Sequence, residues 1–204
     1  MGRAKALLPI TSPTDLFITR ILKTLRDAGV SSIAIVTGTH DREIRSALRG
    51  ALDVVQVVVN PRPEDGQLSS LLLGLDALDD PTLDAIVVAL IDHPLVGVDT
   101  VRALIEAWRT TQKPLVRPTR HDGRHGHPVL FDRSVFTLLR QAPISVGAKA
   151  VIRELGPAVL DLPVNDEGAF IDVDTPEEYE EMLRGIEKGR GASSEERGRA
   201  ARGE

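Results

Sequence analysis

The chain has 204 residues, of which 42% are hydrophobic and 27% are charged, and this composition fits one globular domain with appendages. The absence of cysteine excludes disulfides, cysteine-ligated metals and thiol nucleophiles, and the longest apolar run, 85–91, is too short to cross a bilayer. A net charge of −5 with one Trp, one Tyr and four Phe disfavours nucleic-acid binding, so we expect a cytoplasmic protein that binds neither nucleic acid nor a membrane.

Short β-branched runs alternate with longer amphipathic segments in the first half of the chain. This alternation is typical of strands covered by helices, and it predicts an α/β fold. Strands are predicted at 31–36, 54–59 and 85–91, and the last is apolar throughout, as expected of a central strand. Helices are predicted at 16–25, 41–48 and 69–78, each fitting a right-handed crossover.

The second half continues the pattern and ends in a polar segment. We predict helices at 99–110, 132–139 and 148–155, strands beginning at 115 and covering 129–131 and 158–162, and a hairpin tip at 120–126. A last helix begins at Thr175-Pro176, where threonine caps and proline takes the first position. From Gly185 onward the chain carries almost no apolar residue and cannot bury enough surface to order itself. The domain is therefore predicted to span 1–184, followed by a disordered tail at 185–204.

Two acidic segments are candidate metal-binding sites. Asp92 follows the most apolar strand, and the carboxyl ends of central strands face the ligand crevice. Asp172 and Asp174 alternate, so both carboxylates leave one face of an extended segment just before a helix. Carboxylates of this kind hold Mg²⁺ against substrate phosphates. The alternatives are a turn aspartate before proline for Asp92 and helix-start acids for the pair.

Lys5 is the first member of an ordered series of short motifs. In chain order these are Met-Gly-x-x-Lys-x-Leu-Leu-Pro from Met1, Asn60-Pro61 followed by Gly66-Gln67-Leu68-Ser69-Ser70-Leu71, Asp92-x-Pro94, Gly126-His127-Pro128-Val129, and Asp172-Val173-Asp174-Thr175-Pro176. Each motif is weak alone, but their order is specific. Over about residues 1–183 the chain resembles the MobA-like nucleotidyltransferases, particularly the molybdenum cofactor cytidylyltransferase branch.

The resemblance implies a Rossmann-like open, mostly parallel sheet with helices on both faces, of the nucleotide-diphospho-sugar transferase type. It also implies Mg²⁺-dependent transfer of a nucleoside monophosphate from a triphosphate, with CTP favoured, to a phosphorylated acceptor of the molybdopterin type. A molybdoenzyme is the implied protein partner. Two alternatives stay open: a sugar or lipid phosphate as acceptor, and a degenerate member that binds nucleotide or a partner without turnover.

Individual roles also follow from the resemblance. Lys5 would neutralise the triphosphate, and Asp92 with Asp174 would hold Mg²⁺, which makes Lys5 and Asp92 the catalytic candidates; Asp172 is a weaker metal candidate. Gly66 and Ser70 match the stretch that lies against the nucleoside. His127 matches a motif that lies toward the acceptor, although a structural role is an equal alternative.

The remaining histidines receive no catalytic role. His121, His125 and His127 lie within seven residues of each other, but in a Gly-rich polar loop, whereas zinc ligands are usually held by packed elements. His93 occupies the variable place of its motif.

Three departures from the family pattern mark the chain. A Gly-rich phosphate loop, approximately Leu-Ala-Ala-Gly-x-Ser-x-Arg, and the first strand of the sheet would precede Met1, so we expect the complete protein to begin upstream. Residues 10–15 lack the family's Gly and Lys. Ser145 stands where the family has an acid, which weakens the expectation of a pterin-type acceptor.

Overall fold

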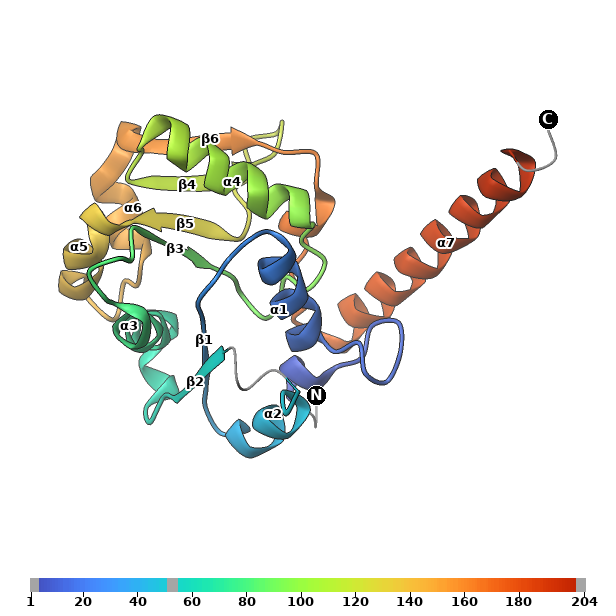
Figure 1. The fold of residues 1–204 in the computed structure, drawn as a ribbon, viewed down its shortest axis with the longest axis horizontal. Coiled ribbons are helices and arrows are strands. Elements are labelled where there is room, and N and C mark those ends of the chain that lie inside the picture. The colour runs from blue at the N-terminus through green and yellow to red at the C-terminus, as the bar shows by residue number, and fades with distance from the viewer. Residues whose placement is uncertain (1–3, 51–54, 201–204) are drawn as a thin grey trace.

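The computed structural model describes residues 4–50 and 55–200, and side chains as far as residue 188. It confirms the α/β class: helices flank two sheets, with a four-stranded sheet above a two-stranded one in the view of Figure 1. Within the described ranges, none of the helices is long and apolar enough to span a membrane.

The larger sheet has the strand order β3-β5-β4-β6, with β3 at Ala85–Val88, β4 at Leu115–Thr119, β5 at Val129–Asp132 and β6 at Val159–Pro163. Strand β5 runs antiparallel to β3 and β4, whereas β4 and β6 are parallel. The direction reverses at the expected hairpin tip, where the Gly126 N–H donates to the Pro118 carbonyl at 2.9 Å. The sheet is therefore mixed rather than mostly parallel.

The smaller sheet pairs β1 (Ile33–Thr37) in parallel with β2 (Val55–Val59), beginning with Ile33 opposite Val55. In the described part of the chain no ladder joins β1 to β3, so β3 ends its sheet instead of lying at the centre. Only the first four residues of the predicted strand 85–91 form β3, because the chain then turns. The turn is closed by the His93 N–H, which donates to the Leu90 carbonyl at 3.3 Å.

Helices and short 3-10 turns connect these strands. The helices are α1 (Phe17–Asp27), α2 (Asp41–Ala47), α3 (Gln67–Leu78), α4 (Val98–Thr111), α5 (Phe136–Gln141), α6 (Lys149–Leu155) and α7 (Pro176–Ala200), and the turns are η1 (Lys5–Leu7), η2 (Pro63–Asp65), η3 (Arg133–Val135), η4 (Gly156–Ala158) and η5 (Glu167–Ala169).

Side-chain alternation along the strands places helices on both faces of the larger sheet. Val116 and Leu130 pack against Leu104 of α4 on one face. The neighbouring residues Leu115 and Phe131 point the other way, into a core shared with α5 and α6. Burying each such side chain contributes about 1.5–3 kcal/mol to folding, so the two apolar layers fix the strand ends that carry the site.

Helix α7 starts as the sequence predicts. The Thr175 hydroxyl accepts from the Glu178 N–H at 3.2 Å, while the Glu178 carboxylate accepts from the Thr175 N–H at 2.8 Å, a reciprocal cap. Its first turns are attached through Tyr179, whose hydroxyl donates to the Pro9 carbonyl at 2.6 Å. The helix then continues through the segment expected to be disordered and extends away from both sheets (Figure 1). The domain boundary at 184 stays a prediction.

Candidate active site

The two acidic segments singled out in the sequence lie side by side. The Val173 N–H donates to the Asp92 carbonyl at 2.9 Å, which joins the turn after β3 to the segment before α7. Asp92 lies in the turn that follows β3. Asp172 and Asp174 are the residues on either side of Val173. The backbone therefore brings Asp92 next to the segment that carries Asp172 and Asp174, and their sharing of one metal site stays a prediction.

Lys5 reaches the same place from the start of the chain. Its Nζ donates to Asp174 Oδ1 at 2.6 Å, with the Lys5 side chain 26% exposed and that of Asp174 60% exposed. The hydrogen bond from Lys5, and then its charge, lower the pKa of Asp174. The predicted phosphate-binding lysine and the predicted metal ligand are thus each other's partner in this structure.

The donor set suits a hard divalent cation. Asp92 Oδ1 is buried and has no hydrogen-bond partner among the described residues, and it lies 3.9 Å from His93 Nε2. Such an atom is available to a ligand. Among the described residues, no group of three or more His, Cys, Asp or Glu side chains forms a complete metal-binding centre. An ion held by Asp92 and Asp174 would therefore keep several waters, as Mg²⁺ does, and would displace Lys5 from Asp174.

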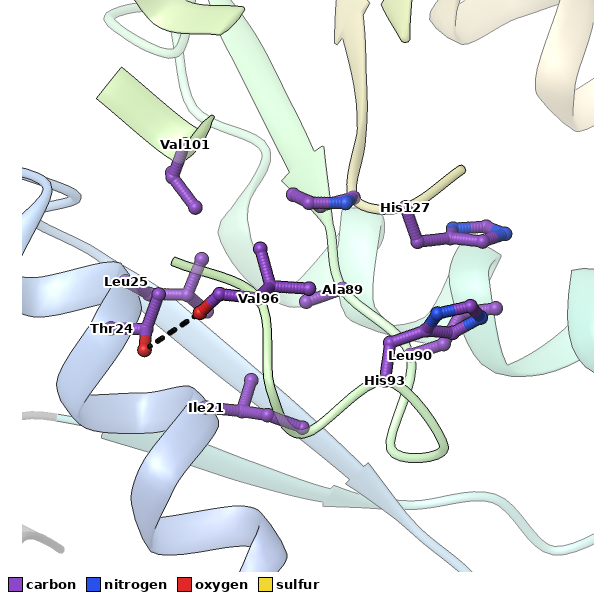
Figure 2. Close-up of a pocket in the computed structure, with 10 residues that line it drawn as sticks. Ile21, Thr24, Leu25, Ala89, Leu90, His93, Val96, Val101 and His127 are labelled. Carbon is purple, nitrogen blue, oxygen red and sulfur yellow. Dashed lines mark hydrogen bonds between the residues drawn. The ribbon is translucent and has the colours of Figure 1, made fainter. Parts of the chain in front are cut away.

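His93 and His127 form a ring pair beside Asp92. Their ring centroids are 4.9 Å apart, and one ring lies above the other at the end of a small, largely apolar cavity (Figure 2). Burial, followed by the charge of His93, lowers the pKa of His127 to about 4. Burial also lowers the pKa of His93, although the nearby charge of Asp92 opposes it. Both rings are consequently neutral at pH 7, so His127 can offer a hydrogen bond but not a positive charge.

His93 is a site residue that the sequence reasoning missed. The charges of Asp92, Asp172, Asp174 and Lys5 all act on its pKa, so it lies within reach of every predicted charged group of the site. The only sequence signal was its place between Asp92 and Pro94. The other loop histidines face elsewhere: His125 Nε2 lies 3.4 Å from Asp161, and His121 is exposed.

Gly66 and Ser70 belong to a second group at the end of β2. Gly66 has φ +90°, a conformation that favours glycine, and the space around its Cα is open to a ligand. The side-chain amide of Asn60 donates to the hydroxyls of Ser69 and Ser70 at 2.8 and 3.0 Å. Asn60 is buried, and sequence reasoning gave it no role of its own; here it fixes the start of α3.

Comparison with known proteins bears on what this site does. The sequence profile of the MobA-like NTP transferase domain matches residues 1–159. The chain belongs to the MobA-like NTP transferase family. Purine catabolism protein PucB of Bacillus subtilis (strain 168) is 27% identical over 125 residues, which cover 60% of this chain and 58% of PucB, so the match spans less than two thirds of that relative.

Solved structures agree with the family over most of the chain. Rv0371c from Mycobacterium tuberculosis H37Rv superposes with a TM-score of 0.75 at 28% identity and covers 90% of each chain. Its complex with manganese superposes with a TM-score of 0.69 at 30% identity, covering 90% of this chain and 93% of that one. The matched family is one of NTP transferases, and the manganese complex of Rv0371c is consistent with divalent-metal use in the family.

Proposed function

We propose that this nucleotidyltransferase uses CTP as its favoured donor and the phosphate of a molybdopterin-type molecule as acceptor, in a Mg²⁺-dependent reaction in the cytoplasm. The proposal is supported by two contacts: Lys5 is paired with Asp174, and Val173, the residue before Asp174, is bonded through its backbone to Asp92. One cation and two carboxylates are the groups needed to receive a metal-bound triphosphate.

The reaction requires positioning and charge neutralisation rather than covalent catalysis. An acceptor phosphate oxygen forms a bond to the α-phosphorus, the bond from that phosphorus to the bridging oxygen breaks, and pyrophosphate leaves with the electron pair. Lys5 would neutralise charge on the triphosphate after leaving Asp174. Asp92 and Asp174 would hold Mg²⁺, which supplies further neutralisation of the triphosphate when bound.

We assign the nucleoside and the acceptor to two separate groups of residues. We place the nucleoside against Gly66 and Ser70, because the open space at Gly66 admits a ligand and Ser70 offers a hydroxyl. We place the acceptor near His127, whose neutral ring and buried Nδ1, unpartnered in the described part, can contribute one hydrogen bond. A molybdoenzyme would be the protein that receives the product.

Product analysis tests this function. The protein, incubated with each nucleoside triphosphate, Mg²⁺ and a panel of phosphorylated acceptors, should give a cytidylylated pterin by mass spectrometry, with equal pyrophosphate. Asp92→Ala should abolish the product, while Asp99→Ala, an exposed aspartate on α4, should not. A product only with sugar or lipid phosphates would change the acceptor, and nucleotide binding without any product would identify a non-catalytic member.

A titration identifies the donor separately. Binding of CTP, GTP and ATP in Mg²⁺ is compared by calorimetry, and CTP should bind tightest. A clear preference for GTP would move the protein to guanylyl transfer and leave the site assignment intact.

A further inference from the structure

The segment 166–174, which we name the acidic strap, joins β6 to α7 and contacts both parts of the site. Its far end donates from the Val173 N–H to the Asp92 carbonyl, and its middle accepts from the His127 N–H at Ala169 O, at 2.9 Å in each case. The near end is held by Asp166. The strap therefore connects Asp92, His127 and the two acids Asp172 and Asp174.

Asp166 is the side-chain anchor of this strap. Its Oδ2 accepts from the Gly97 N–H at 2.8 Å and from the Thr100 hydroxyl at 2.6 Å, and its Oδ1 accepts from the Gly168 N–H at 3.0 Å. Gly97 and Thr100 stand at the start of the fourteen-residue helix α4, where a carboxylate is also favoured by the helix dipole. Because Thr100 is only 5% exposed, its hydroxyl has little water to replace this partner.

The fit of the strap leaves no room for a side chain at two points. A Cβ added at Gly168 would lie 2.2 Å from the Leu95 carbonyl oxygen, and one added at Gly126 would lie 2.3 Å from the Ala169 carbonyl oxygen. Both contacts are with backbone, which cannot move aside as a flexible side chain can. The strap is thus seated directly on the loop that carries Asp92 and on the segment that carries His127.

These contacts form a closed frame. Asp92 and Gly97 belong to one loop, and the strap is bonded to that loop at both places, through Val173 and through Asp166. Arg124 also donates to the Phe170 carbonyl in the middle of the strap, at 3.0 Å, but Asp166 is the strap residue whose side chain is bonded to the loop that carries Asp92. We infer that Asp166 is a positioning residue that sets the spacing between Asp92 and Asp174 and thereby tunes the affinity of the site for a divalent cation. This inference rests on the proposed metal site.

The test measures Mn²⁺ binding to the full chain without substrate, by electron paramagnetic resonance or calorimetry. Asp166→Asn should weaken Mn²⁺ binding by about tenfold, in the range expected when a group that orients metal ligands is lost, with a circular dichroism spectrum like that of the parent. Nucleotidyl transfer should recover when the metal is raised by the same factor. A merely structural role would not produce recovery by metal.

Companion variants keep the test decisive if Asp166→Asn folds poorly. Thr100→Val removes the hydroxyl at nearly constant volume and should also weaken Mn²⁺ binding. Thr100→Ser keeps a hydroxyl and should bind Mn²⁺ as the parent does. Asp161→Asn is the matched control, because the Asp161 carboxylate also accepts a side-chain hydrogen bond, from Arg117, but lies outside the strap.

The outcomes separate the two claims. If Asp92→Ala weakens Mn²⁺ binding but Asp166→Asn and Thr100→Val do not, the positioning role of Asp166 is overturned and the proposed function stands. If Asp92→Ala leaves Mn²⁺ binding unchanged, the proposed metal site is itself wrong and the inference falls with it.

Discussion

Lys5 and Asp174 lie 169 residues apart in the chain and form an ion pair of 2.6 Å. The pair brings the start of the chain to the segment before α7, and it satisfies two groups that the proposed reaction needs separately. In the proposed reaction, substrate binding would therefore exchange these partners: Lys5 would move to the triphosphate, and Asp174 to the metal. The exchange costs little because Asp174 is well exposed, and exposed pairs contribute about 0–1 kcal/mol.

The exchange predicts that Asp174→Asn changes the affinity for tripolyphosphate in opposite directions in EDTA and in Mg²⁺. Asp174→Asn frees Lys5, so tripolyphosphate should bind about two- to fivefold tighter in EDTA but weaker in Mg²⁺. Lys5→Met should weaken binding in both. Calorimetric titration measures the affinities. Asp27→Asn, which frees Lys23 on α1 in the same way, is the control and should change neither. Weaker binding of tripolyphosphate to Asp174→Asn in EDTA would contradict the exchange.

The histidine pair predicts a pH dependence of stability. The folded pKa of His127 is about 4, below the ordinary 6.5, so between these values the unfolded chain binds more protons than the folded one. The free energy of unfolding should fall as the pH drops from 6.5 to 4, by at most about 3 kcal/mol from this group. His127→Gln should flatten that part of the curve in urea titrations, whereas His121→Gln should not. Parallel curves for His127→Gln and the parent would refute the assignment.

The last helix predicts where the folded domain ends. Ile186 packs against the cluster that contains Leu8, Phe17 and Met182, whereas the helix beyond it extends away from the sheets. Deleting 189–204 should leave the melting temperature nearly unchanged, and deleting 185–204 should lower it slightly because Ile186 is lost. Calorimetric melting of both truncations tests this. A loss of several degrees on removing 189–204 alone would show that this segment docks on the domain.

The sequence predicted features of the fold that depend on local interactions better than features that depend on contacts between distant segments. Strand and helix periodicity is local, and it predicted the α/β class and the position of most elements. The strand prediction failed at 89–91. The chain turns there, the His93 N–H closes the turn, and no sequence pattern marks it. The strand prediction also placed β3 at the centre of a sheet, because an apolar run predicts burial but does not identify the neighbouring strands.

The same contrast between local patterns and long-range contacts applies to the site. The motifs predicted roles for Lys5, Asp92 and Asp174; the structure brings Lys5 and Asp174 into contact, and the roles of the three residues stay predictions. No motif predicted Asp166 or the pairing of His93 with His127, because both depend on contacts between segments more than thirty residues apart in the chain.

The central claim is that Asp92 and Asp174 act together on one metal ion in nucleotidyl transfer. The most direct measurement is kcat/KM for transfer by Asp92→Ala, Asp174→Ala and the double variant, each with a circular dichroism spectrum to confirm folding. Because the two residues share one role, each single variant should lose transfer, and the double variant should be barely worse than either. Full activity in Asp92→Ala, or losses that multiply in the double variant, would contradict the account.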